Sequence, residues 1–408
     1  MHTRPLGPFQ VSALGLGCMS FSHGYGSADE NESARILHAA LDAGYTFLDT
    51  ATMYGGGHNE SLIGKTLKAR RQEYVLASKC GLYRGEDGKP TVNGRPEVLK
   101  QQCEASLRRL QTDVIDLYYL HRMDANVPIE ESVGALADMQ RAGKIQGIGL
   151  SEVSTASLRR AHAEAPIMAV QSEYSLWSRT PEISMLDACT ELGVTFVPFS
   201  PLARAFLTGK AVDNSQLPAD DIRSTNARPR FEPDNFARNS ELLKPYAAVA
   251  ERVGCSMAQL ALAWLLSLTT AGKHTLIPHP STKHMDFMLE NAGAGDLLLD
   301  DATLSELNEL INEDKVVGTR YTAALMQSTD RTGSAGLTGK GSAGRSAPAD
   351  QHHPNRRGSF CALSSAPARS LLLTSTTVVV VIHLDFNSHP ALTSMSTPSI
   401  AQGIFASS

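Results

Sequence analysis

The six cysteines of this 408-residue chain lack the spacing of a metal or redox motif. No two of them form a C-x-x-C pair, and no set of them has the intervals of a zinc site. Cysteines this far apart in a chain of this size are typical of reduced thiols, so we expect a cytoplasmic protein. They are Cys18, Cys80, Cys103, Cys189, Cys255 and Cys361.

Charge of one sign and long apolar runs are also scarce. The net charge of -5 argues against a nucleic acid or an anionic membrane as partner. The first ten residues have none of the features of a secretion signal. Residues 371–382 are the one run that resembles a membrane span, but they fall short of the roughly 20 apolar residues that a transmembrane helix needs. We therefore expect no membrane partner.

Eight short apolar runs are present between residues 10 and 290, and amphipathic segments separate them. The runs are rich in Val, Ile, Leu and Tyr and nearly continuously apolar, as in parallel strands that are buried on both faces. Their alternation with helical segments over short connections predicts an α/β fold with a parallel sheet. The runs are 12–17, 45–49, 73–79, 114–120, 144–150, 167–171, 194–200 and 274–278.

Two α/β architectures compete, the closed (β/α)8 TIM barrel and the doubly wound open sheet. An open sheet that binds a dinucleotide usually has G-x-G-x-x-G after its first strand, and the sequence GLGCMSFSHGYG there does not fit. The count of eight strands favours the barrel. Residues 4–12 are expected to form a hairpin that closes the barrel floor, with Gly7-Pro8 at its turn.

The composition changes after residue 322. From Ala323 onward Gly, Ser, Ala and Pro dominate, and no apolar periodicity is present. Such a stretch cannot bury enough surface to offset its ordering entropy. We therefore expect a barrel over residues 1–322 and a low-complexity, disordered extension over 323–408.

Four ionisable side chains are placed at, or just after, the ends of predicted strands. Asp49 ends the second strand, Tyr54 lies in the loop that follows, Lys79 ends the third strand and His121 directly follows the fourth. One such residue alone is weak evidence, because a single strand-end histidine is more often structural. Since the carboxyl ends of the strands meet at one mouth of a TIM barrel, the four together indicate an active site.

This set has the chemistry that reduction of a carbonyl group needs. A tyrosine hydroxyl has an ordinary pKa of about 10, and a nearby ammonium group stabilises the phenolate. Lys79 is expected to lower the pKa of Tyr54, and Asp49 is expected to hold and balance the lysine. Neutral His121 can hydrogen-bond the carbonyl oxygen and orient it.

Several segments resemble the aldo-keto reductase superfamily in order and spacing. They are LDTATMYGGGHNESLIGKTL, VIDLYYLHR, KIQGIGLSEVS, AVQSEYSLWSR and VPFSPLARAFLTGK, and the resemblance covers roughly residues 3–322. It implies the (β/α)8 fold, NADPH in preference to NADH, no metal, and hydride transfer to an aldehyde or ketone. Asp49, Tyr54, Lys79 and His121 match the family tetrad position by position, with Tyr54 as the acid.

The resemblance also implies residues that hold the nicotinamide. Ser151, Glu152 and Gln171 match positions that bind the carboxamide, although Glu152 stands where many members have asparagine and cannot donate a hydrogen bond. Phe199 matches the aromatic residue that stacks on the ring, and its alternative role is core packing.

Further positions match the rest of the cofactor site. Ser200, Leu202 and Arg204 resemble the loop that crosses the pyrophosphate, in which Ala203 and Ala205 replace the glycines usual in this subgroup.

The adenosine end is matched by residues after the eighth strand. Ser281, Thr282 and Lys283 fit the stretch that binds the 2'-phosphate, and Asn291 fits the adenine edge. The cationic Lys283 favours NADP over NAD. The usual arginine is absent and His284 stands beside the lysine, so a weaker preference is expected.

No sequence feature identifies the substrate. Small aldehydes or quinone-like carbonyls are expected, with pyridoxal or a sugar aldehyde as an alternative. A different class of function is a cofactor-binding regulatory subunit resembling potassium-channel β-subunits, although no docking segment is apparent. The expected substrate rim, each member of which can equally pack a loop, is Met19, Phe21, Tyr25, Tyr83, Arg122 and Trp177.

Overall fold

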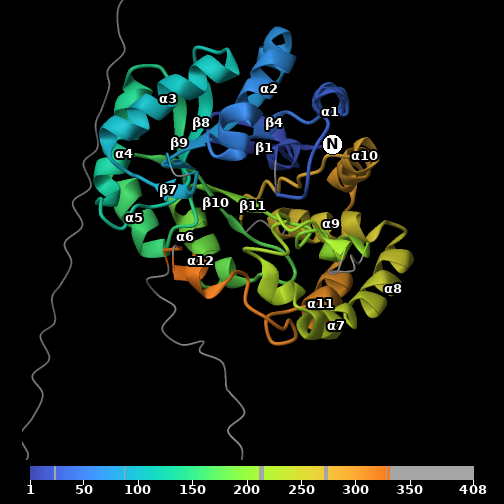
Figure 1. Cartoon of the computed structure of the whole chain (residues 1–408). Helices are drawn as coiled ribbons and strands as arrows, with labels where there is room; N and C mark the ends of the chain where they lie inside the picture. The colour runs from blue at the N-terminus through green and yellow to red at the C-terminus, as the bar shows by residue number, and fades with distance from the viewer. Residues whose placement is uncertain (23, 87, 211–215, 271–273, 328, 331–408) are drawn as a thin grey trace, which may run out of the picture. The chain divides into compact units, whose positions relative to one another are not determined.

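The computed structural model describes residues 1–22, 24–86, 88–210, 216–270, 274–327 and 329–330 (Figure 1). The apolar run 371–382, and the predicted extension from residue 331 onward, lie outside the described residues. No single helix in the described part of the chain is long and apolar enough to cross a membrane. A helix pair over residues 233–253 and 257–269 meets that criterion only when its two parts are taken together across a 78° bend.

A seven-stranded parallel sheet forms the centre of the fold. Its strands are neighbours in the order β3, β4, β5, β8, β9, β10 and β11, so each crosses over to the next strand along the chain. This arrangement confirms the predicted parallel α/β architecture. The bounds are β3 (Leu16–Gly17), β4 (Phe47–Asp49), β5 (Val75–Cys80), β8 (Ile115–Leu120), β9 (Ile145–Ser151), β10 (Ile167–Glu173) and β11 (Thr195–Phe199).

The predicted eighth strand, 274–278, connects the two edges of this sheet without forming a regular strand. Leu276 bridges to Phe196 of β11, and Ser281 bridges to Gly17 of β3, both in parallel orientation. The segment therefore closes the ring, as the TIM barrel prediction requires.

Two prolines explain why the pairing here is irregular. Pro278 and Pro280 have no backbone N–H, so they cannot donate to a sheet ladder. Their carbonyl oxygens still accept, from Gly15 N at 3.0 Å and from Gly17 N at 3.0 Å. The barrel is thus closed by one-sided hydrogen bonds at this seam.

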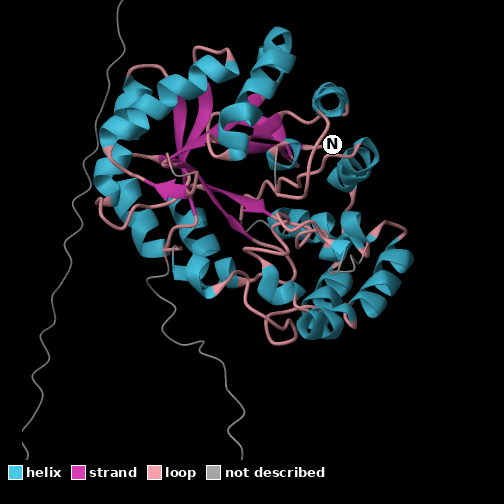
Figure 2. Ribbon diagram, viewed as in Figure 1, coloured by secondary structure: helices cyan, strands magenta, loops and turns pink. Residues whose placement is uncertain are grey.

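Helices surround the sheet (Figure 2). The sequence signals at their ends are local: Pro96 begins α3, and the side chains of Asp29 and Ser154 cap α1 and α5. The helices are α1 (Glu30–Asp42), α2 (His58–Leu67), α3 (Pro96–Leu110), α4 (Ile129–Arg141), α5 (Thr155–Glu164), α6 (Met185–Leu192), α7 (Pro233–Ser240), α8 (Leu243–Val253), α9 (Met257–Thr270), α10 (Met285–Ala292), α11 (Asp301–Leu310) and α12 (Ala323–Gln327).

An antiparallel hairpin covers one end of the barrel. It consists of β1 (Thr3–Leu6) and β2 (Phe9–Ser12), and Gly7 at its turn has φ of 56°, a conformation that favours glycine. Leu6 and Val11 are buried in one cluster with the apolar side chains of the barrel interior. The predicted hairpin floor is therefore confirmed.

Two features of the fold were not predicted. A second hairpin, β6 (Leu82–Arg84) with β7 (Pro90–Val92), follows β5. The first residues of the expected extension form α12, Thr329 is buried, and the Asp330 carboxylate accepts a hydrogen bond from Ser154 N at 2.9 Å. Ordered packing therefore continues past the predicted boundary at residue 322.

Candidate active site

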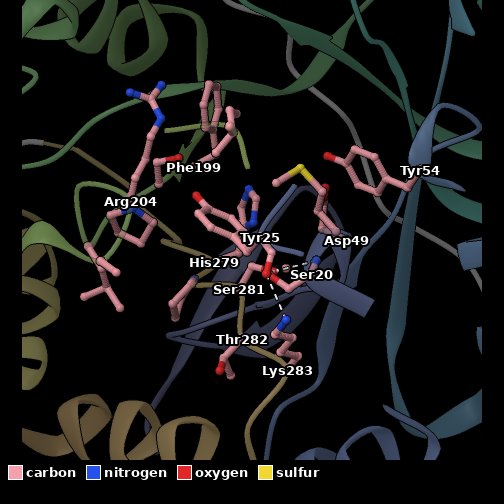
Figure 3. A pocket seen from close by; sticks show the side chains of 18 of the residues that line it. Ser20, Tyr25, Asp49, Tyr54, Phe199, Arg204, His279, Ser281, Thr282 and Lys283 are labelled. Atoms are coloured by element: carbon pink, nitrogen blue, oxygen red, sulfur yellow. Dashed lines mark hydrogen bonds between the residues drawn. The ribbon is translucent and has the colours of Figure 1, made fainter. Parts of the chain in front are cut away.

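A cavity of about 650 Å³ lies at the carboxyl ends of the barrel strands. Figure 3 shows Tyr54 on one side of this cavity, Phe199 on another and Lys283 below them. Most of the predicted site residues line it, from strands and loops far apart in the sequence. They are Met19, Tyr25, Asp49, Tyr54, His121, Arg122, Ser151, Gln171, Phe199, Ser200, Leu202, Arg204, Ser281, Thr282, Lys283 and Asn291.

Asp49, Lys79 and Tyr54 form a hydrogen-bonded chain that leads into the cavity. The Lys79 ammonium group is fully buried and donates to the Asp49 carboxylate and to Thr50 O, the latter at 2.8 Å. It also donates to the Tyr54 hydroxyl at 3.4 Å. Asp49 accepts a further hydrogen bond from Gln171 Nε2 at 2.8 Å, so the carboxylate is held from two sides.

Three glycines bring Tyr54 to this position. Gly55, Gly56 and Gly57 have φ of 59°, 64° and 97°, so the chain reverses directly after the tyrosine in a conformation that other residues rarely adopt. Asn59, the second residue of α2, ties this turn to the barrel by donating to Cys18 O at 2.8 Å. The turn after Tyr54 thus explains why three glycines follow one another in the sequence.

Burial and charge act against each other at Tyr54 and Lys79. Burial raises the pKa of Tyr54 above its usual value of 10, while the Lys79 ammonium group opposes that rise. The expected lowering of this pKa is therefore outweighed. Burial alone would lower the pKa of Lys79, but the Asp49 carboxylate and Tyr54 raise it above its usual value. Tyr54 is accordingly a neutral phenol beside a permanent cation.

His121, the fourth of the predicted catalytic residues, lies at the mouth of the barrel. Its ring meets the Tyr54 ring edge-on, with centroids 5.9 Å apart and an interplanar angle of 85°. Arg122 beside it donates to the Ser151 hydroxyl at 3.2 Å and also lines the cavity. The four predicted catalytic residues are therefore brought together in one place.

Glu152 is held in an ion pair away from the cavity lining. Its carboxylate accepts from both terminal nitrogens of Arg320, one at 3.0 Å, and from Glu173 N at 3.0 Å. Burial would raise its pKa, but the Arg320 guanidinium lowers it to about 2. Of the three residues expected at the carboxamide, Ser151 and Gln171 line the cavity and Glu152 does not.

The loop after β11 has an unusual backbone. Ala203, Arg204 and Ala205 follow one another with φ of 52°, 55° and 72°. Glycine adopts such angles without cost, whereas alanine does not, so the replacement of glycines noted in the sequence falls at strained positions. Arg204 is fully buried and donates to Glu173 Oε2 at 2.5 Å, which anchors this loop to β10.

The end of the cavity near α10 carries cationic and hydroxyl groups. Lys283 Nζ donates to Tyr25 O at 2.8 Å and to Ser27 O at 2.6 Å. The Ser281 hydroxyl lies 2.7 Å from the Ser20 hydroxyl. The predicted phosphate-binding stretch therefore connects directly to the loop that follows β3.

Three of the expected substrate residues lie elsewhere among the described residues. Trp177 is fully buried and stacks on Phe206 with ring centroids 4.6 Å apart, so it packs the core. Phe21 is buried in the main hydrophobic cluster, and Tyr83 lies on β6 outside the set that lines the cavity. Trp177 and Phe21 therefore have a packing role, which the sequence analysis gave as the alternative to substrate contact.

Other residues of the cavity escaped the sequence analysis. His279 lies just after the predicted eighth strand, and Lys210 and Arg223 lie between β11 and α7, where no motif in the sequence marked them. Leu82 and Val92 come from the hairpin that was not predicted. Among the residues described, no cluster of three or more His, Cys, Asp or Glu side chains has an arrangement that could hold a metal ion.

Comparison with known proteins agrees with this geometry. The family model described as aldo/keto reductase family matches residues 13–312. The aldo-keto reductase yakc of Schizosaccharomyces pombe, whose name includes NADP(+), is 40% identical over 325 residues, which cover 78% of this chain and 94% of that protein. Probable aldo-keto reductase 1 of Glycine max is 39% identical over 315 residues, or 77% of this chain and 89% of its own length.

Solved structures show the same fold. A glycerol dehydrogenase from Gluconobacter oxydans superposes with a TM-score of 0.69 at 27% identity, covering 76% of this chain and 94% of the other. An aldo/keto reductase from Klebsiella pneumoniae in complex with NADP and acetate has a TM-score of 0.58 at 26% identity, covering 75% and 95%. With the family model and the 40% identical relative, these matches show that the chain belongs to the aldo/keto reductase family of oxidoreductases.

Proposed function

We propose that this protein reduces an aldehyde or ketone with NADPH, and that Tyr54 donates the proton. The observation that carries the proposal is the chain from Asp49 through Lys79 to the Tyr54 hydroxyl, which ends in the cavity beside His121. A carbonyl oxygen placed between Tyr54 and His121 is within reach of both side chains, which is the geometry that general acid catalysis requires.

The electrostatics of the chain fit proton donation. Because burial raises the pKa of Tyr54, the phenol keeps its proton over the whole neutral range and is available as an acid. Once the proton has moved to the carbonyl oxygen, the Lys79 cation stabilises the phenolate that remains. Asp49 keeps Lys79 charged and directs it toward Tyr54.

The cavity offers groups that suit each part of NADPH. Gln171 and Ser151 present an amide and a hydroxyl for the carboxamide, and Phe199 is partly exposed to the cavity, as a stacking residue must be. Thr282 and Lys283 lie at the start of α10, where a helix N-terminus also favours an anion. When bound, the reduced nicotinamide supplies the hydride that the carbonyl carbon accepts.

Cationic side chains at the adenosine end support NADPH over NADH. Lys210 and Arg223 line the cavity together with Lys283, and only NADPH carries a 2'-phosphate that these charges can pair with. Lys210 Nζ lies 3.3 Å from the centroid of the Phe287 ring, and Arg223 is paired with Asp221. Because each cation already has a partner, each contributes only part of its charge to binding a phosphate. A moderate preference for NADPH over NADH follows.

Part of the cavity lining is apolar, and this favours apolar carbonyl compounds. Met19, Met53, Leu82, Val92 and Leu325 line the cavity. Aryl or alkyl aldehydes and ketones lose no hydrogen bonds against such a wall, whereas the hydroxyl groups of a sugar aldehyde would.

Tyr54→Phe tests the proposal. The variant should lower kcat for an aromatic aldehyde by at least about a hundredfold, because positioned acid catalysis contributes this much, and should leave the Kd of NADPH nearly unchanged. Absorbance of NADPH measures kcat, and titration calorimetry measures the Kd. Tyr74→Phe removes the hydroxyl group of a mostly buried tyrosine outside the cavity and serves as the control. Unchanged turnover of Tyr54→Phe would refute Tyr54 as the acid.

A further inference from the structure

Arg122 is a cation of the cavity lining that has no acidic partner of its own. It directly follows His121, and its Nη1 donates to His121 O at 2.6 Å and to the Ser151 hydroxyl at 3.2 Å. Ser151 and Tyr54 line the same cavity, so the bond to Ser151 holds the guanidinium group at the cavity wall. Among the residues that the structure describes, none supplies a carboxylate for an ion pair with Arg122.

Two acidic side chains close to Arg122 are held by other partners. Asp124 accepts from the backbone N of Asn126 at 2.9 Å and from its side-chain amide at 3.1 Å. Glu152 follows Ser151 and senses the charge of Arg122, but its oxygens accept from both terminal nitrogens of Arg320. The positive charge of Arg122 is therefore left over at the cavity, while the neighbouring charges are paired or hydrogen-bonded.

The order of the strands places Arg122 across the barrel mouth from the predicted phosphate-binding stretch. It follows β8, the fourth strand in the ring of seven, whereas the seam with Ser281 and Lys283 closes the ring between β11 and β3. Burial raises the pKa of Tyr54, and Arg122 is one of the cations that oppose this rise, so its charge is near the reacting hydroxyl. Arg122 is therefore placed to meet the substrate and not the phosphates of a bound NADPH.

The chemistry of the group restricts what it can bind. A guanidinium group is planar, always charged, and presents parallel N–H donors that fit the two oxygens of a carboxylate. Only Nη1 of Arg122 is used by the described residues, so Nη2 and Nε remain as donors. A dianionic phosphate is less suited, because a single cation balances half of its charge. Met53, Leu82 and Val92 line the same cavity and suit the apolar part of a ligand.

We propose that Arg122 is a specificity-determining residue that binds the carboxylate of an oxo acid, a substrate with an aldehyde or ketone at one end of an apolar frame and a carboxylate at the other. This inference rests on the proposed reduction of a carbonyl group with Tyr54 as the acid. The carbonyl oxygen is held by Tyr54 and His121, and the carboxylate is held by Arg122. The hydride and the proton come from the same groups as before, so Arg122 changes which compound is reduced and not the balance of the reaction.

The formylbenzoates and their methyl esters test this role in the native protein. The ortho, meta and para isomers place the carboxylate at different distances from the aldehyde, and each ester differs from its acid by the loss of the charge. For at least one isomer, kcat/KM of the acid should exceed that of its ester by at least about tenfold, which is what a charged hydrogen bond contributes. Because this comparison needs no variant, it does not depend on the folding of one.

Substitutions assign the preference to Arg122. Arg122→Met should reduce the acid-to-ester ratio of kcat/KM to about one, and Arg122→Lys, which keeps the charge but not the planar donors, should recover part of it. Arg84→Met is the matched control: Arg84 is on β6, the strand with the cavity residue Leu82, and donates to Gly88 O at 2.9 Å. It removes the same charge outside the cavity lining, so the ratio should stay at the native value.

The outcomes separate this inference from the proposed function. Equal kcat/KM for acids and esters in the native protein would overturn the inference alone, as would equal losses for acids and esters in Arg122→Met. A loss of the acid preference in Arg84→Met as large as in Arg122→Met would also overturn it, since general attraction of anions would then explain the ratio. Absence of NADPH oxidation by the native protein with every one of these aldehydes would instead refute the proposed function.

Discussion

Glu152 illustrates how one residue takes its role from distant neighbours. A carboxylate in a buried position is unfavourable unless it is paired and hydrogen-bonded. Arg320, 168 residues away, supplies the charge, and Glu173 N supplies a further donor. Glu173 is in turn bonded to Arg204. Glu152 thus anchors the segment that precedes α12 in this chain.

Glu152→Gln should destabilise the fold by about 3 kcal/mol at pH 7, since it leaves Arg320 buried without its main partner. The folded-state pKa of about 2 lies below the ordinary 4.5. The pair's contribution is therefore fully present above about pH 4.5 and is lost as the pH falls toward 2. The difference in melting temperature between the two proteins should therefore shrink as the pH falls from 7 to 3 and disappear only near pH 2.

The matched control is Glu130→Gln, which removes half of an exposed ion pair. Arg160 donates to both oxygens of Glu130 at 2.7 Å, in the same bidentate geometry, but both side chains are in contact with solvent. Its melting temperature should stay nearly unchanged, because exposed pairs contribute little. Equal losses of melting temperature in the two variants would show that burial does not determine how much Glu152 contributes to stability.

At the scale of elements, the loop after β11 combines precise placement with strain. Its residues line the cavity and are anchored through Arg204, yet three of them in succession adopt left-handed angles. This conformation is unfavourable for residues that have a side chain, because their Cβ comes too close to the backbone. The loop therefore holds its shape because its surroundings impose it.

Ala205→Gly should raise the stability of the protein by up to about 1 kcal/mol, because glycine relieves the strain at φ of 72° and the entropy of the unfolded chain offsets only part of the gain. The same substitution in a regular helix should act in the opposite direction. Ala39→Gly in α1 is expected to cost about 1 kcal/mol. Chemical denaturation of both variants measures the two signs, and a loss in Ala205→Gly would contradict the strain argument.

At the scale of the whole molecule, the position of the barrel's C-terminal edge can be tested by truncation. We still propose that a separate extension follows the barrel, but α12 and the bond from Ser154 N to Asp330 belong to the packed part. Leu325 also lines the cavity. The functional boundary is therefore expected after residue 330 instead of residue 322.

A chain that ends at Asp330 should melt within about one degree of the full-length protein. A chain that ends at Thr322 should melt roughly 3 °C lower, because it loses the hydrogen bond to Asp330 and the packing of α12. It should also show a higher KM for an aromatic aldehyde, since Leu325 is gone. Calorimetry and the NADPH assay measure both effects. Identical melting of the two truncated chains would place the boundary back at residue 322.

Much of the fold followed from local patterns. Continuous apolar runs between amphipathic segments predicted the barrel strands. The tetrad could be placed because strand ends converge in a barrel: Asp49, Lys79 and His121 needed only their position on a strand. The spacing of apolar residues along a segment depends only on neighbouring positions, so it can be read directly from the sequence.

Tertiary structure decided the pairings between distant residues. Glu152 meets Arg320, Trp177 packs against Phe206, and the last barrel segment joins the first strand at Ser281 only when the ring closes. The same closure buries His279 beside Gly17. Sequence alone predicted that four candidate catalytic groups share one barrel mouth. Which other groups surround them depends on contacts across the chain, which no local pattern encodes.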